Sequence, residues 1–383
     1  MEVVKALFTV FMYDTFGIKP SGERYNTEAT KSMLEKIPQL LADGTAQKGN
    51  ELGLIELNDV LFDTYETEGG TEKYKGIGLG CPYAVHLKNR PFLDTLYGDG
   101  TFGVELKESN PSGNWTYEML KTESSNFISN NQVITDEVIK IWTIVILYKV
   151  SFGVDVSYDD AKSFVEFKDE FLKLSILPQA PYPACVFSDT MEKKMKYINQ
   201  FIAMMPIDMS ADEKRVNANQ ILEAMVFAGG VSVPQMVIVI LSRWALGELD
   251  EFDMTDEHDL MLVIMEALSR DPPVAGLCPV KILGERIHTY NFASMINNAF
   301  SEPSKFKRRD DIAKYKRELI SFADQALPVD GAPGSARVCP GKSLAFHMIL
   351  SFICSMDFRC KIVSPPDRDT HLRYKNLNLK IGI

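Results

Sequence analysis

Apolar residues recur along the central third of the chain at the three- and four-residue spacing of a helix buried along one face. This pattern predicts helices over Val138 to Val150, Tyr158 to Lys173 and Asp189 to Ala203. It also predicts a long, strongly apolar helix from Ala211 to Leu246, followed by one from Asp256 to Ser269 with Thr255 or Asp256 as its N-cap. A further helix is expected over 28–42, near the beginning of the chain.

Short alternating segments predict a small amount of β-structure. They are a hairpin region at Ile77 to Leu87, strands at Val280 to Leu283 and Arg286 to Ser294, and a C-terminal hairpin around Pro365-Pro366. No internal repeat or low-complexity linker divides the chain. The expected fold class is therefore mainly α with small β-sheets, in one compact domain over residues 1–383.

The net charge of the chain argues against a nucleic-acid partner. The chain of 383 residues carries 41 basic and 52 acidic side chains, a net charge of −11, without a basic stripe of the kind that nucleic acids require. The longest apolar stretch near the N-terminus, Val3 to Tyr13, is short and contains Lys5, and no run long enough to span a membrane stands out. We expect no membrane anchor, no nucleic-acid partner and a soluble protein, cytoplasmic or peripheral.

The most informative chemistry lies around Cys339, in a Gly- and Pro-rich loop just before an apolar segment that predicts a helix. Backbone N–H groups from Gly341 onward, together with the positive end of that helix, favour a thiolate at Cys339. A thiolate held in this way can be the axial ligand of a haem iron. A buried structural cysteine is the alternative interpretation.

The Arg337-x-Cys339-x-Gly341 spacing resembles the haem-binding loop of the cytochrome P-450 superfamily. Other segments resemble that superfamily in the same order. They are Gly113-Asn114-Trp115, Ala228-Gly229-Gly230-Val231-Ser232, Glu266 to Pro273, Asn298 to Phe306 and Leu372 to Leu377. The resemblance implies a single-domain P-450 fold that binds haem b, with Cys339 as its metal ligand.

The resemblance also implies which side chains meet the haem. Arg337 would meet a propionate, and Gly341, Ala228 and Gly229 would contact the group. Trp115 would contact it together with a basic residue, for which Lys121 is the nearest substitute because Met119 holds the usual position. In the Glu-x-x-Arg pair that begins at Glu266, Ser269 replaces the arginine. Arg270, one residue late, can still pair with Glu266 at i, i+4, so we expect the ion network behind the cysteine loop to be altered.

The central helix differs most from the superfamily pattern. Oxygen-activating members carry an acid beside an alcohol, but here Val231 precedes Ser232, and no acid lies between Glu223 and Glu248. Pro234 has no N–H to give the Gly230 carbonyl, so a kink is expected there. Ser232 and Gln235 are then the polar groups expected to face a ligand, and they are the candidate catalytic residues. They are better suited to orienting a substrate oxygen than to donating protons.

These differences resemble features of plant-type allene oxide synthases, hydroperoxide lyases and the haem domains of fungal dioxygenase fusions. They favour an enzyme that rearranges, dehydrates or cleaves an oxidised lipophilic substrate, such as a fatty-acid hydroperoxide, without a reductase. A monooxygenase that depends on a reductase and acts on a lipophilic or secondary-metabolite substrate is one alternative. A degenerate, non-catalytic haem-binding protein is the other. The sequence leaves open whether a redox partner is needed, and whether the chain belongs to a larger fusion protein.

Overall fold

A computed structural model describes residues 64–66, 73–75, 83–98, 106–175, 187–271, 273, 280–282, 285–287, 306–310, 339–356, 358–368 and 374–381. Within these ranges the helices are α3 (Tyr83–Tyr97), α4 (Tyr117–Ser129), α5 (Asp136–Phe152), α6 (Tyr158–Ser175), α7 (Ser188–Met204), α8 (Ala211–Glu223), the π-helix η6 (Ala224–Ala228), α9 (Gly229–Ala245), α10 (Glu257–Arg270) and α12 (Lys342–Cys354). The strands are β1 (Thr64–Glu66), β2 (Lys73–Lys75), β3 (Val133–Thr135), β4 (Val280–Ile282), β5 (Glu285–Ile287), β6 (Lys361–Ser364), β7 (Asp367–Arg368), β8 (Tyr374–Lys375) and β9 (Asn378–Lys380). The mainly α fold class with small sheets is confirmed.

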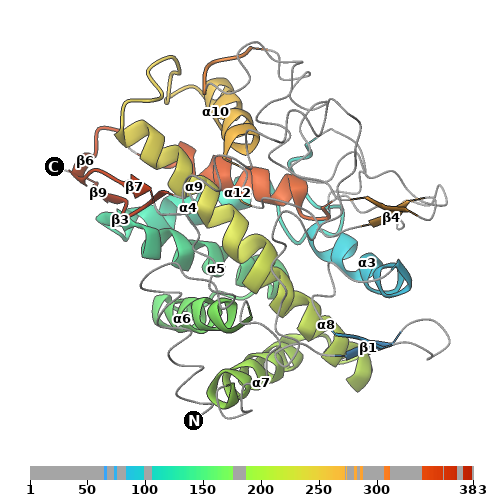
Figure 1. Cartoon of the computed structure of the whole chain (residues 1–383). Coiled ribbons are helices and arrows are strands. Elements are labelled where there is room, and N and C mark those ends of the chain that lie inside the picture. The colour runs from blue at the N-terminus through green and yellow to red at the C-terminus, as the bar shows by residue number, and fades with distance from the viewer. Residues whose placement is uncertain are drawn as a thin grey trace, which may run out of the picture.

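The continuous helix formed by α8, η6 and α9 runs diagonally through the molecule, and the other helices are arranged around it (Figure 1). α5 packs along α9 on one side, while α12 crosses α9 and packs against α4 and α10. Large aromatic side chains fill this centre, among them Trp142 and Phe352, whose ring centroids lie 4.6 Å apart. The indole N–H of Trp142 donates to Ser124, which is hydrogen-bonded to Ser351 of α12, so these three buried polar groups satisfy one another.

Local capping explains where several helices begin. Ser210 and Glu213 form a reciprocal capping box at the start of α8, and Asp256 accepts a hydrogen bond from the N–H of Asp259 at the start of α10. Thr135 caps α5 in the same way, and α5 ends at Gly153, which has φ +67°. The sequence therefore placed these helices correctly to within a few residues.

The helix from Ala211 to Ala245 is long and apolar enough to cross a membrane by length and composition, which differs from our expectation that no run would qualify. Two thirds of its most apolar window is nevertheless buried inside the protein (67%). Because α5, α10 and α12 all pack against α9, the apolar character of this helix is accounted for by its place in the core.

Two β predictions need correction. Residues 83–87 of the expected hairpin region belong to α3, and the rest of that region lies outside the described residues. The C-terminal strands do not form a hairpin around Pro365-Pro366. Instead β6 pairs with β9, in a sheet of order β3-β9-β6, and β7 pairs with β8. The two prolines have no N–H for a ladder and mark the point where the chain leaves one sheet for another.

Of the remaining β predictions, β4 confirms the strand at Val280 to Leu283. β5 overlaps the expected strand at Arg286 to Ser294 in its first two residues, and the rest of that strand is not described. The helix expected over 28–42 also lies outside the described residues.

Candidate functional site

Cys339 lies three residues before α12, and its backbone carbonyl accepts a hydrogen bond from the N–H of Lys342 at 3.3 Å. Gly341 is the N-cap and has no side chain to accept from the first turn, which also contains no acidic residue. The positive end of α12 is therefore directed at the loop that holds Cys339, and its effect is not offset by a local carboxylate. This arrangement favours the thiolate form of a cysteine.

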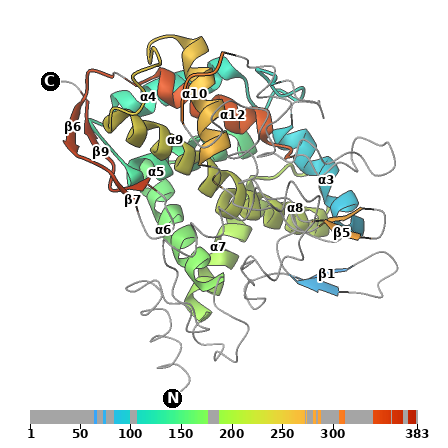
Figure 2. The same ribbon diagram turned by 45° about the horizontal axis from the view of Figure 1, so that its top comes forward.

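The C-terminal end of α3 closes one side of this loop. A Cβ on Gly341 would lie 3.9 Å from the Cβ of Tyr97, the last residue of α3. The Tyr97 hydroxyl is hydrogen-bonded to Ser151 of α5 at 2.9 Å. Figures 1 and 2 both place α3 beyond the N-terminal end of α12. Gly341, two residues after Cys339, therefore lies where α3, α5 and α12 come together.

The central helix is irregular at the position where the sequence resembles the P-450 pattern. Residues Ala224 to Ala228 form a π-helical turn, and the N–H of Gly229 donates to the carbonyl of Ala224, five residues earlier. π-turns insert one residue into a helix and are frequent at functional sites. The helix α9 continues through Pro234, where a kink was expected, and the kink stays a prediction; the π-turn ends six residues before that proline.

Gly230 makes this turn possible. A Cβ on Gly230 would lie 1.6 Å from the carbonyl oxygen of Met225, so no larger residue fits while the turn is kept. Gly229 has a different role, because its Cβ would face the side chain of Leu147 on α5, at 3.1 Å. Gly229 thus allows close packing of α9 on α5, and this contact lies about 100° around the helix from Ala228.

One stripe of the central helix is not fully covered. Ala228, Val231, Ser232 and Gln235 are all partly exposed, whereas Val233, Pro234 and the six residues from Met236 to Leu241 are buried. Phe227 and Gly229 are partly exposed as well, but Ala228, Val231, Ser232 and Gln235 have the spacing of one helix face. At α12, the N-cap Gly341 and Ala345 are likewise partly exposed, whereas the other residues from Lys342 to Ile353 are buried. Two core helices that pack against each other thus each leave one face partly open.

Gln235 carries an unsatisfied donor on this stripe. Its amide nitrogen Nε2 is buried and has no hydrogen-bond partner within the described part of the chain. Leaving such a donor unpaired costs about 1–3 kcal/mol. A ligand acceptor beside the stripe would remove that cost. Ser232 and Gln235, the two residues predicted to face a ligand, both lie on the stripe, together with Ala228.

In the structure, Trp115 and Lys121 both make contacts within the protein, and their roles beside a haem stay predictions. Trp115 is fully buried, and its indole N–H donates to the Tyr97 carbonyl at 3.2 Å, so no donor remains for a haem carboxylate. The Lys121 ammonium lies 5.6 Å from the ring of Tyr117, whose hydroxyl is 3.7 Å from the sulfur of Cys354. Cys354 is at the far end of α12, about 20 Å of helix rise from Gly341. Arg337 lies outside the described residues.

The ion pair behind the loop is formed by Glu266. Glu266 is fully buried and pairs with Arg309, and its carboxylate also accepts from the N–H of Lys307 at 3.3 Å. This guanidinium comes from another segment of the chain, and the side chain of Arg270, which could pair with Glu266 at i, i+4, lies outside the described residues. Ser269 is itself buried, and its hydroxyl has no partner among the described residues. Arg309 is a partner of Glu266 that the sequence did not reveal, and the altered network stays a prediction.

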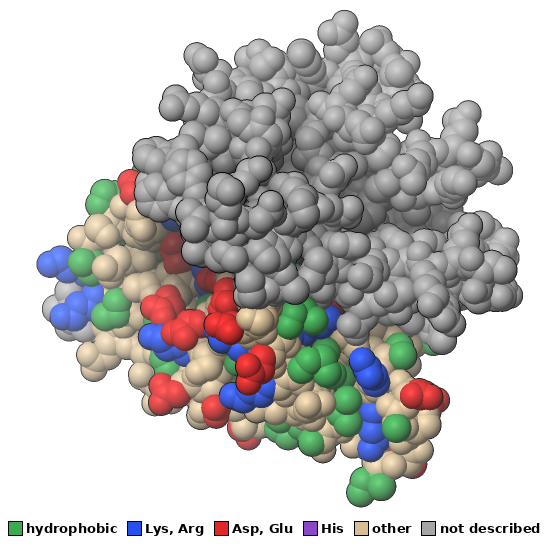
Figure 3. All heavy atoms as spheres, turned by 60° about the horizontal axis from the view of Figure 1, so that its bottom comes forward, with side chains coloured by type: hydrophobic (Ala, Val, Ile, Leu, Met, Phe, Trp, Pro, Cys, Tyr) green, Lys and Arg blue, Asp and Glu red, His purple; other side chains and the backbone are tan. Residues whose placement is uncertain are grey.

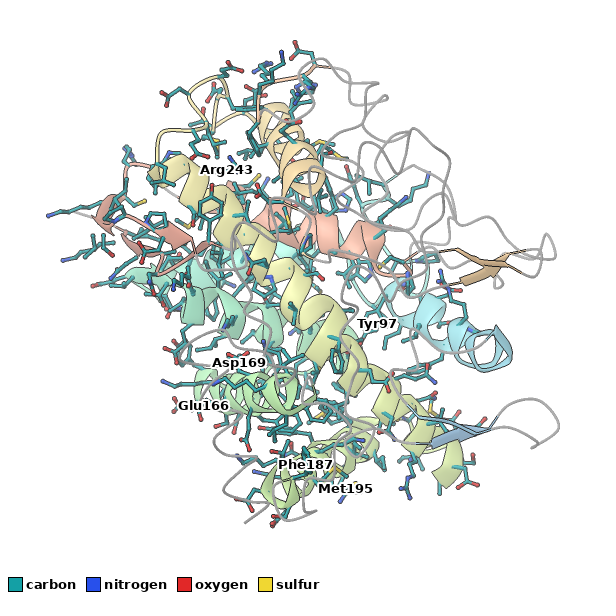
Figure 4. The ribbon with its side chains drawn as sticks, in the orientation of Figure 1. Tyr97, Glu166, Asp169, Phe187, Met195 and Arg243 are labelled. Carbon is teal, nitrogen blue, oxygen red and sulfur yellow. The ribbon has the colours of Figure 1, made fainter. Side chains whose placement is uncertain are left out.

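Arg243, at the end of α9, anchors a second charged cluster. Its guanidinium binds Asp271 and Glu248, each at 2.5 Å, and stacks on Phe306 at 4.3 Å (Figure 4). Burial would lower the pKa of Arg243, but the charges of Asp271, Tyr374 and Glu248 raise it, so the side chain stays charged. This cluster ties the segment that contains Arg309 to the end of the central helix.

Sequence reasoning missed one basic residue, Arg90 on α3. Its side chain is buried, with 4% exposed, and its Nε donates to Asp94 at 2.6 Å. Arg90 precedes Tyr97 by seven residues, about 10 Å along a helix whose end contacts Gly341. No helix was expected at Arg90, so the sequence gave no signal for its position.

Comparison with solved structures identifies the architecture. A mutant of P450 EryK in complex with erythromycin B superposes with a TM-score of 0.59, at 13% identity, over 94% of this chain and 98% of that chain. The chain has the cytochrome P-450 fold. CYP154C4 from Streptomyces sp. W2061 matches this P-450 fold with a TM-score of 0.55, at 11% identity, over 88% of this chain and 84% of that one. CalO2 matches with a TM-score of 0.50, at 14% identity, over 83% and 92% of the two chains.

No family model matches the sequence, and no curated protein does. The chain is therefore a divergent example of the P-450 fold, recognised through its structure.

Proposed function

We propose that the chain is a haem-thiolate enzyme, that haem b lies between the open face of α9 and the start of α12, and that Cys339 is its axial ligand. The observation that carries this proposal is the partly open stripe at Ala228, Val231, Ser232 and Gln235, on a helix whose other residues from Gly230 to Arg243 are buried. The buried amide nitrogen of Gln235, which has no partner there, fits a bound group better than a sealed core. The P-450 fold and the position of Cys339 before α12 support the same location.

Several chain groups fit the cofactor. The first-turn N–H groups of α12 and its positive end would stabilise the sulfur as a thiolate, and a thiolate-bound haem supplies the electron density that favours O–O cleavage. Cations are needed for the haem carboxylates. We propose Arg337 for one of these carboxylates, as the resemblance implies, and Arg90 for the other in place of Lys121.

For the reaction, we propose the rearrangement, dehydration or cleavage of an oxidised lipophilic substrate such as a fatty-acid hydroperoxide, without a reductase. The stripe offers a hydroxyl and an amide but no carboxylate, and no acid lies between Glu223 and Glu248. Ser232 and Gln235 can therefore hold and orient an oxygen that the substrate brings, but they are poor sources of the protons that dioxygen activation requires. Val231, the third side chain of the stripe, helps to exclude water.

A second candidate is a monooxygenase that depends on a reductase and acts on a lipophilic or secondary-metabolite substrate. The P450 EryK structure contains erythromycin B, and its fold matches over nearly the whole length of both chains, which favours this candidate. Protons would then have to reach the stripe through water held by Ser232.

One experiment separates the two candidates. Purified protein is mixed with a long-chain fatty-acid hydroperoxide, with and without NADPH and a reductase. Consumption without either addition supports hydroperoxide chemistry, and Gln235→Leu should then change the distribution of products, because it removes the amide that orients the oxygen. Gln235→Glu, of nearly equal size, is the matched control for shape. Turnover that occurs only with the reductase would favour the monooxygenase.

A further inference from the structure

Three side chains from the ends of three helices form a hydrogen-bonded line at the far end of α12 from Cys339. Tyr117 begins α4, Glu257 begins α10 and Cys354 ends α12, and α12 packs against both other helices. The Tyr117 hydroxyl donates to the Glu257 carboxylate at 2.7 Å and lies 3.7 Å from the Cys354 sulfur. Because the single proton of the hydroxyl goes to Glu257, the thiol is the donor in the second contact. The hydrogens therefore point in one direction, from thiol to phenol to carboxylate.

The line joins a buried ring to two groups that reach solvent. Tyr117 is 7% exposed, whereas Glu257 is exposed and Cys354 is partly exposed. Burial raises the pKa of Tyr117 and also the pKa of Cys354, so both groups keep their protons at neutral pH. The arrangement thus does not favour the thiolate that nucleophilic chemistry requires. A neutral phenol that is hydrogen-bonded to a carboxylate can instead lose an electron and a proton together.

Ring contacts connect Tyr117 to the beginning of α12. The centroid of the His347 ring lies 5.2 Å from that of Tyr117 and 6.2 Å from that of Trp115. The indole N–H of Trp115 donates to the carbonyl of Tyr97, which is the residue next to Gly341. Tyrosine and tryptophan are among the side chains that lose a single electron most readily to a strong oxidant. An oxidation that begins near the cysteine loop can therefore reach Tyr117 through neighbouring rings.

We propose that Tyr117 and Cys354 pass electrons from an external thiol to the haem pocket, and that they thereby give the protein a thiol-dependent peroxidase activity toward lipid hydroperoxides. The inference rests on the proposed function, because it takes the O–O bond to be cleaved in that pocket. Tyr117 loses one electron toward the pocket and its proton to Glu257, which returns the proton to solvent. Cys354 then gives its hydrogen atom to Tyr117. The thiyl group that remains takes a hydrogen atom from the external thiol.

The atoms and electrons of this reaction balance. Two passes supply two electrons and two protons, which convert one hydroperoxide to one alcohol and one water. The two thiyl radicals of the external thiol combine to one disulfide, so the hydroperoxide is the oxidant and the thiol is the reductant. The S–H bond of a thiol and the O–H bond of a phenol have similar strengths, so hydrogen transfer from Cys354 to Tyr117 is reversible. Oxidation of the external thiol makes it proceed.

A photochemical experiment tests the pair without any turnover of hydroperoxide. A ruthenium photo-oxidant with persulfate takes single electrons from the purified protein, and a nitrone spin trap labels the thiyl group, which mass spectrometry then locates. We expect the label on Cys354 in the unmodified protein and its loss in Tyr117→Phe. Tyr148→Phe, which changes another buried tyrosine, should be labelled like the unmodified protein. Equal labelling in Tyr117→Phe would show that the sulfur is oxidised directly and would overturn the inference.

Two further variants separate the proton step from the hydrogen-atom step. Glu257→Gln removes the proton acceptor and should lower the initial rate of Cys354 labelling by about 100-fold, the lower end of the contribution of a positioned base. Glu118→Gln, at an exposed position beside Tyr117 in α4, should not change that rate. Cys354→Ser should leave the radical on Tyr117, where electron paramagnetic resonance detects a tyrosyl signal. An unchanged rate in Glu257→Gln, or no tyrosyl signal in Cys354→Ser, would contradict the proposal.

The peroxidase activity is measured with a long-chain fatty-acid hydroperoxide and glutathione as the thiol. Cys354→Ser should lose most of the thiol-dependent conversion to the alcohol, and Cys360→Ser, at another partly exposed cysteine, should keep it. Equal conversion in Cys354→Ser and the unmodified protein would refute the inference. The haem absorption spectrum of the same samples tests the proposed function separately. A thiolate spectrum without Tyr117-dependent labelling would refute only this inference, whereas labelling without that spectrum would refute the proposed function and the peroxidase activity with it.

Discussion

Replacing Gly230 with alanine tests the π-turn of the central helix. In an ordinary helix this change is favourable by about 1 kcal/mol, because alanine loses less backbone entropy than glycine. Here the new Cβ would lie 1.6 Å from the Met225 carbonyl oxygen, a backbone atom that cannot move without unwinding η6. Overpacking of this kind costs about 1–3 kcal/mol even where side chains can adjust. We therefore expect Gly230→Ala to lower the free energy of unfolding by about 3 kcal/mol.

Gly229→Ala is the matched control on the neighbouring residue. Its Cβ would approach Leu147 Cδ1 at 3.1 Å, the end of a flexible side chain that can shift by a few tenths of an ångström. The favourable helix term of about 1 kcal/mol then offsets most of the packing cost. We expect Gly229→Ala to change the free energy of unfolding by no more than about 1 kcal/mol in either direction.

Both variants are compared by urea unfolding, followed by circular dichroism and by haem content. Gly230→Ala should also lose much of its haem, because the stripe at Ser232 and Gln235 changes its orientation when the extra residue of the π-turn is lost. If the two alanine variants prove equally stable, the Met225 carbonyl does not occupy the place described here. The account of the central helix would then be wrong.

Two further sets of substitutions test buried or partly buried ion pairs, one at Glu266 and one at Asp169. Arg309→Met should lower the free energy of unfolding by about 3–5 kcal/mol, because it removes the cation beside the buried Glu266 carboxylate. Arg308→Met, in which the cation of the pair with Asp259 is itself more exposed, should lower it by clearly less in urea unfolding. Equal losses in the two variants would contradict this view. Burial would raise the pKa of Asp169, but the charges and hydrogen bonds of Lys168 and Lys140 lower it below the ordinary value of about 3.9. The interaction of Asp169 with these lysines therefore stabilises the fold at neutral pH, and this contribution is lost as the pH falls below about 4. Asp169→Asn should be less stable at pH 7 and less sensitive to acid in denaturation curves, and an unchanged acid profile would refute this prediction.

Acidic and basic side chains are mixed on one face of the protein. On the described part of the face shown in Figure 3, red and blue side chains lie among each other and do not form a basic patch. Charged side chains also pair, such as Lys193 with Glu170 and Lys140 with Asp169, both within 2.8 Å. Exposed pairs of this kind contribute little to stability.

The elements that the sequence predicted well are those whose signals are local. Ser210 with Glu213 and Asp256 mark helix starts through hydrogen bonds within one turn, and the apolar spacing after Ala211 predicted the long central helix. The thiolate at Cys339, which stays a prediction, also rests on a local signal, because the chemistry of a cysteine before a helix start depends on its neighbours.

What the sequence could not predict depends on contacts between distant residues. The partner of Glu266 is Arg309, 43 positions away, and no spacing rule connects them. The π-turn at Ala224–Ala228 was not predicted, because a glycine such as Gly230 does not by itself indicate a close approach to a carbonyl five residues earlier. Trp115 has the expected residue type, but its N–H is satisfied by Tyr97. A resemblance in sequence order therefore gave the fold more securely than it gave the individual contacts.

The reduced, carbon-monoxide-bound absorption spectrum of the purified protein, compared with that of Cys339→Ala, tests the central claim most directly. We predict the band that is typical of thiolate ligation in the unmodified protein and its loss in the variant, with Cys354→Ala as a control that keeps it. A colourless protein, or a Cys339→Ala variant with an unchanged spectrum, would show that position 339 does not bind the metal.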